Sequence, residues 1–134
     1  FELTRLGINE LLKSYLSRVS KENERSCTRS YLDCIYQLYL FALLERYPYT
    51  DLFWEYLSLC FDTVSRHLVE HKLLVSCQVF LSKVTLMGKW AAQKNLHTNL
   101  IQHFLHNMEI WAREEGYLEL ADSAKNHRFN LETV

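Results

Sequence analysis

Residues that break regular secondary structure are scarce in this sequence. Its 134 residues include one proline and three glycines. Its apolar residues recur at every third or fourth position. This spacing is typical of amphipathic helices and gives strands little support. The sequence therefore predicts an all-α fold.

An excess of charge of either sign is also lacking. The 15 basic and 16 acidic residues leave a net charge of −1, which removes the broad attraction on which nucleic-acid and anionic-membrane binding usually depend. Stretches without charged residues, such as Leu73 to Ser82, are too short to cross a bilayer. We expect a soluble chain, with nucleic acid and membrane disfavoured as partners.

The four cysteines lack the close pairing of structural zinc sites. Cys27, Cys34, Cys60 and Cys77 all fall in predicted helices, which favours free thiols, with Cys60 and Cys77 in the core. Free thiols suit a reducing compartment. No basic and then apolar leader precedes them in the sequence. We therefore expect an intracellular protein of the cytoplasm or nucleus.

Local signals predict where the first helices begin and end. The first helix should give way to the polar run 20–25, and the second should begin near Ser26 or Thr28, whose hydroxyls can cap its first amides. Pro48 disfavours the helical conformation at the residue before it, so the second helix should stop there. A third helix is expected to open at Thr50.

Different sequence signals predict where the third, fourth and fifth helices end. A break near residues 70–72 should separate the third and fourth helices, although one long helix over 51–90 is the alternative. Gly88 and the polar run 93–98 mark the next transition. Gly116 should end the fifth helix, because glycine readily takes the left-handed conformation that closes a helix.

Short connections favour antiparallel neighbours. We expect about six antiparallel helices, arranged as a helical bundle or as stacked helical hairpins of the tetratricopeptide or HEAT kind, in a single domain over residues 1–134. Because the first residue is Phe1 rather than Met, this domain is expected to be excised from a longer polypeptide.

The segment 111–125 carries a more specific pattern. Gly116 is followed five residues later by Ala121, which resembles the turn and the small-residue packing point of a tetratricopeptide-type hairpin. The resemblance covers one hairpin, and the other predicted hairpins lack the matching glycine and alanine. It implies a helical-repeat scaffold that binds a peptide or another subunit, with no catalytic residues to carry over.

Two histidine clusters suggest metal chemistry. His67, Glu70 and His71 match the H-x-x-E-H order, in which two histidines bind zinc and the glutamate activates a metal-bound water. A zinc-dependent hydrolase is therefore one alternative, and a solvated helix end is the other. His103, His106 and Glu109 also share a helix face, which suggests a second metal site. The alternative, which we favour, is a polar face opposite the apolar stripe of this helix. We expect no enzyme, no metal and no cofactor.

Aromatic residues crowd the region around Pro48 in larger number than one face of two helices can bury. Tyrosine and tryptophan provide large contact areas at low entropic cost, so exposed ones favour a partner-binding surface. The alternative is that the core absorbs them. The candidate partner-binding residues are Tyr36, Tyr39, Tyr47, Tyr49, Phe53, Trp54 and Tyr56.

The function predicted from these features is a protein-interaction scaffold or adaptor. Its partner would be another protein or peptide, neighbouring domains of its own chain, or a second copy in a homo-oligomer. A helical-repeat RNA-binding module is an alternative. It is disfavoured because Arg46 is the only basic residue between Tyr31 and Leu57, whereas base stacking is normally combined with phosphate contacts.

Overall fold

The computed structural model describes residues 2–44, 50–93 and 99–132, and within these ranges the chain forms six α-helices and no strand. The all-α prediction is therefore confirmed. The helices are α1 (Glu2–Arg18), α2 (Glu24–Leu44), α3 (Thr50–Glu70), α4 (Leu74–Gln93), α5 (Asn99–Glu114) and α6 (Leu118–Glu132). No helix in the described ranges is long and apolar enough to cross a membrane.

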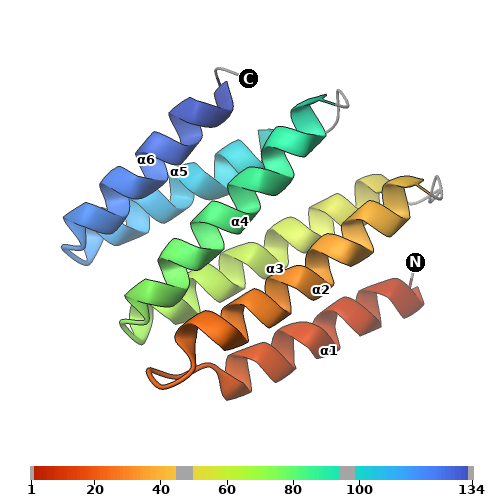
Figure 1. The fold of residues 1–134 in the computed structure, drawn as a ribbon, viewed down its shortest axis with the longest axis horizontal. Coiled ribbons are helices and arrows are strands. Elements are labelled where there is room, and N and C mark those ends of the chain that lie inside the picture. The colour runs from red at the N-terminus through yellow and green to blue at the C-terminus, as the bar shows by residue number, and fades with distance from the viewer. Residues whose placement is uncertain (1, 45–49, 94–98, 133–134) are drawn as a thin grey trace.

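Consecutive helices form three antiparallel hairpins that stack side by side, as Figure 1 shows. In one row α2 contacts α4 and α4 contacts α6, while in the other row α1 contacts α3 and α3 contacts α5. Helix α4 lies at the centre, because it contacts α2 and α6 within its row and α3 and α5 in the other. Of the two expected architectures, the observed one is the stack of hairpins.

The core is centred on three phenylalanine rings. Phe61 of α3, Phe80 of α4 and Phe104 of α5 lie 5.2–5.7 Å from one another between ring centroids, and all three are almost fully buried. Cys60 and Cys77 are also buried free thiols, as predicted. Burial raises the pKa of Cys60 to about 11 and that of Cys77 to about 12.

The first hairpin departs from its predicted boundary. Helix α2 begins at Glu24 rather than near Ser26 or Thr28. Thr28 is fully buried, and its hydroxyl lies 2.8 Å from that of Tyr15 on α1, so it joins two helices instead of capping one. Asn23 closes the connection, because its side chain accepts a hydrogen bond from the Ser20 amide at 2.8 Å.

The two later hairpins use the same turn. After α5, Gly116 adopts φ 82°, its amide donates to Arg113, and the Tyr117 amide donates to Ala112. After α3, Lys72 adopts φ 57° and the amides of Lys72 and Leu73 make the equivalent bonds. This is the Schellman arrangement that satisfies the last carbonyls of a helix. The break expected near 70–72 is confirmed, with a lysine where glycine is the usual residue.

Gly88 does not mark the end of the fourth helix, since α4 continues to Gln93. A Cβ atom at Gly88 would lie 3.1 Å from the Leu131 side chain and 3.2 Å from that of Ile101. The glycine is therefore placed where α4 packs closely against α5 and α6. The predicted stop at Pro48, and residues 94–98 of the predicted polar run, lie outside the described residues.

Candidate functional site

A groove runs between the outward faces of α2 and α4. It consists of two adjoining hollows of about 340 and 350 Å³ that share Lys83 and Leu86. We call it the α2–α4 groove. Helix α2 lines it with Arg25, Arg29, Asp33 and Tyr36. Helix α4 lines it with Val75, Val79, Lys83, Leu86, Lys89 and Trp90.

Helical spacing explains why these residues meet. The α2 residues are separated by three or four positions, and so are Val75, Val79, Lys83, Leu86 and Trp90 of α4, which places each set along one face of its helix. The two helices run side by side in the same direction. At one end the Glu24 carboxylate accepts hydrogen bonds from the amide and hydroxyl of Ser76, at 3.3 and 3.4 Å. Because Ser76 lies in the first turn of α4, Glu24 also fixes the start of this helix.

Apolar side chains lie open to solvent along the groove. Leu86 is 57% exposed and Val75 is 39% exposed, whereas Cys77, Phe80, Leu81 and Val84 on the other side of α4 are fully buried. Val79 and Trp90 on the same side are partly buried against the core. The outward side of α4 thus carries a second apolar stripe, interrupted by Lys83, that consists of Val75, Val79, Leu86 and Trp90. This outward stripe is visible in the sequence, but our sequence analysis did not identify it.

Positive charge predominates in the groove. Lys83 pairs with Asp33 across it, with a distance of 3.4 Å between Nζ and Oδ1. Arg25, Arg29 and Lys89 form no ion pair with a carboxylate among the described residues. Helix α4 itself contains no Asp or Glu. The groove thus combines exposed apolar side chains with three cations, Arg25, Arg29 and Lys89, that pair with no carboxylate in the part of the chain that the structure describes.

The structure describes the side chains of only some residues of the predicted aromatic surface. Phe53 is 2% exposed and belongs to the core, so its assignment to a binding surface is wrong; α3 turns this ring inward. Tyr36 and Tyr56 are partly buried against the core, and Tyr36 lines the α2–α4 groove. Nothing is described of the side chains of Tyr39 and Trp54. Tyr47 and Tyr49 lie outside the described residues.

The H-x-x-E-H residues lie at the end of α3. The His67 and His71 rings stack at 4.1 Å, and Nδ1 of His71 lies 2.8 Å from the His67 carbonyl oxygen. Burial, together with the neighbouring His71, lowers the pKa of His67. Among the residues that the structure describes, no group of three or more His, Cys, Asp or Glu side chains could hold a metal ion. The motif therefore finds no third ligand in this part of the chain.

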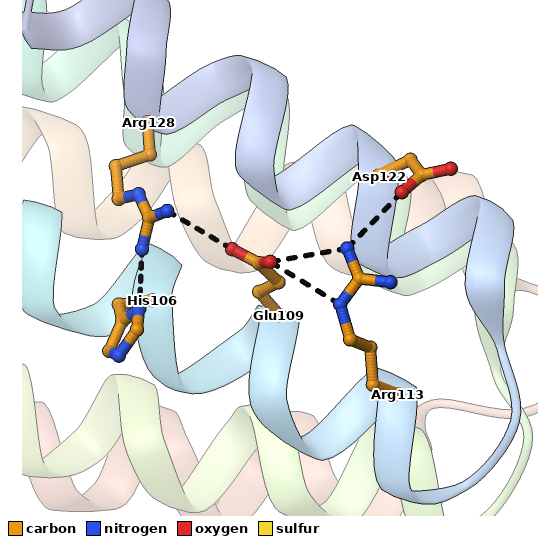
Figure 2. A network of polar contacts seen from close by, with 5 residues as sticks. All are labelled: His106, Glu109, Arg113, Asp122 and Arg128. Carbon is orange, nitrogen blue, oxygen red and sulfur yellow. Dashed lines mark hydrogen bonds and ion pairs between the residues drawn. The ribbon is translucent and has the colours of Figure 1, made fainter.

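The second histidine cluster takes part in an ion-pair network instead, shown in Figure 2. Glu109 of α5 lies 3.2 Å from Arg113 and 3.3 Å from Arg128 of α6, and Arg113 also pairs with Asp122 of α6 at 3.3 Å. Arg128 additionally contacts Nδ1 of His106. We call these five residues the α5–α6 network. Glu109 and His106 of the cluster thus link α5 to α6 through arginines, whereas His103 is not part of the network.

Comparison of the chain with protein-family models, with curated proteins and with solved structures finds no match.

Proposed function

We propose that this protein is an interaction domain that binds a segment of another protein in the α2–α4 groove. The observation that carries the proposal is the pair of adjoining hollows, which share Lys83 and Leu86 and expose Val75 and Leu86 to solvent. Exposed apolar surface next to polar residues is typical of partner-binding sites. Ligand sites are concave and mostly apolar, with a few polar groups that orient the ligand.

The groove also revises the predicted aromatic surface. Of its candidate residues, Tyr36 is the one that lines the groove, and Trp90 adds an aromatic side chain that our sequence analysis did not include. Tyrosine and tryptophan are enriched where partners bind most tightly. The proposed surface therefore lies on α2 and α4 rather than around Pro48.

The test is selection of peptides from a displayed library of random 16-residue sequences, followed by affinity measurement with fluorescent versions of the enriched peptides. Leu86→Ser removes an exposed apolar side chain from the groove. Leu59→Ser is the matched control, because Leu59 is a 63% exposed leucine of α3 that lines neither hollow. Circular dichroism should show that both variants remain folded.

We expect Leu86→Ser to weaken the binding of enriched peptides about tenfold, since one buried leucine at an interface is worth about 1.5 kcal/mol or more. Leu59→Ser should leave binding unchanged. If no enriched peptide responds to Leu86→Ser, or if both variants weaken binding equally, the groove is not the binding site.

A further inference from the structure

The distribution of charge along the α2–α4 groove specifies what kind of segment fits it. Arg25 and Arg29 line one hollow, Lys89 lines the other, and Lys83 lies where the two meet. Among the residues that the structure describes, the single carboxylate that lines either hollow is Asp33, which is already paired with Lys83. A bound segment therefore meets cations over the whole length of the groove, although the chain as a whole has a net charge of −1.

The apolar stripe sets the length and pattern of the segment. Val75 and Trp90 mark its ends, which are about 22 Å apart along α4 at a rise of 1.5 Å per residue. A helix of about four turns covers this distance. Such a helix could lay one apolar face over Val79 and Leu86, as amphipathic helices do in grooves.

We propose that the occupant of the groove is an acidic amphipathic helix of another protein, about 15 residues long by the helical rise; this inference rests on the proposed function. Its apolar face covers the stripe on α4, and its Asp and Glu side chains pair with Arg25, Arg29 and Lys89. Complementary charge across an interface increases the association rate and excludes partners of the wrong charge.

The experiment uses the peptides enriched from the random library. Their composition is the first readout, and we expect an excess of Asp and Glu together with apolar residues at spacings of three and four. The tightest peptide is then compared with a version in which every Glu and Asp is replaced by Gln and Asn. The neutral version should bind at least tenfold more weakly at low salt, and the difference should shrink as salt screens the charges.

Charge reversals in the protein locate the effect. Arg29→Glu and Lys89→Glu change cations of the groove, whereas Lys13→Glu makes the same change in net charge at an exposed position of α1. We expect Arg29→Glu and Lys89→Glu each to weaken the binding of the acidic peptide about tenfold. Lys13→Glu should weaken this binding less than twofold. Equal losses in all three variants would overturn the inference, because they would reflect net charge alone.

The remaining outcomes separate this inference from the proposed function. If Leu86→Ser weakens the binding of enriched peptides that carry no acidic excess, the inference of an acidic partner is overturned, and the groove remains a binding site. If Leu86→Ser weakens the binding of no enriched peptide, both the proposed function and the inference of an acidic partner are overturned. Binding of a 20-nucleotide oligouridylate that is lost with Lys89→Glu would assign the cations to nucleic acid instead. A dimer of the protein alone that is broken by Leu86→Ser would assign the groove to a second copy.

Discussion

The α2–α4 groove and the α5–α6 network are both contacts between neighbouring helices, yet they use charge in opposite ways. In the network Glu109 lies between Arg113 and Arg128, and its side chain is 14% exposed. In the groove Arg29 and Lys89 have no such carboxylate among the described residues. Charges neutralised within the fold hold helices together, whereas the cations beside exposed apolar residues support the proposed binding of a partner.

Replacement of Glu109 by alanine should have the largest effect on stability. Without this carboxylate the guanidinium groups of Arg113 and Arg128 face each other with no shared counter-ion. We expect a loss of about 1–2 kcal/mol in the free energy of unfolding, reduced from the value for a buried pair because Arg113 is 42% exposed. Urea denaturation measures this loss.

The matched change in the groove is Asp33→Ala, which removes the partner of Lys83. Because the Asp33 side chain is 58% exposed, the free energy of unfolding should change by less than about 0.5 kcal/mol. Equal losses in the Asp33 and Glu109 variants would contradict the contrast between the two contacts.

The turns that lead into α6 and α4 offer a second contrast. Gly116→Ala should cost about 1 kcal/mol, because alanine is strained at φ 82° although its Cβ would meet nothing within 4 Å. Lys72→Gly should instead stabilise the protein by about 0.5 kcal/mol, since relief of strain at φ 57° slightly exceeds the added freedom of the unfolded chain. Thermal denaturation of both variants measures these opposite changes in stability. A loss of stability in both variants would contradict the equivalence of the two turns.

The smallest expected effect concerns Lys89, a groove cation that also acts on α6. Burial and then the nearby Lys89 ammonium lower the pKa of His127 from its ordinary value of 6.5. The unfolded chain therefore binds this proton more readily, and stability is lost as the pH falls below 6.5. In Lys89→Gln the His127 pKa should rise, and this loss of stability should become smaller.

Titration of His127 by NMR measures that change directly. A pKa of His127 that is the same in Lys89→Gln and in the unchanged protein would show that the Lys89 charge does not reach α6. Lys13→Gln serves as the control, because it removes the same charge from an exposed position of α1.

Most of the fold could be predicted because helical spacing and helix ends are local properties. The spacing of apolar residues located the six helices, and Gly116 correctly ended the fifth. Thr28 and Gly88 were misread for one reason. Each has a local interpretation, as a cap or a break, that is overridden by a contact with another helix, to Tyr15 and to Leu131 respectively.

The groove could not be predicted in the same way, because it depends on which helices become neighbours. The second apolar stripe of α4 is visible in the sequence at Val75, Val79 and Leu86. That α2 lies beside it, and contributes Arg25 and Arg29, follows only from the stacking of the hairpins. Phe53 shows the same limit, since an aromatic cluster in sequence does not reveal which rings point inward.

The contacts among the rings of Phe61, Phe80 and Phe104 couple the unfolding of two hairpins. Phe61 and Phe80 belong to the second hairpin and Phe104 to the third, so neither hairpin can open without separating these rings. In the first hairpin the stacked rings of Tyr15 and Tyr31, 4.5 Å apart, join α1 to α2 within the same hairpin. We expect the second and third hairpins to form one unit of local unfolding, with amide protons that exchange together. The first hairpin is held to the second by the contacts of α1 with α3 and of α2 with α4.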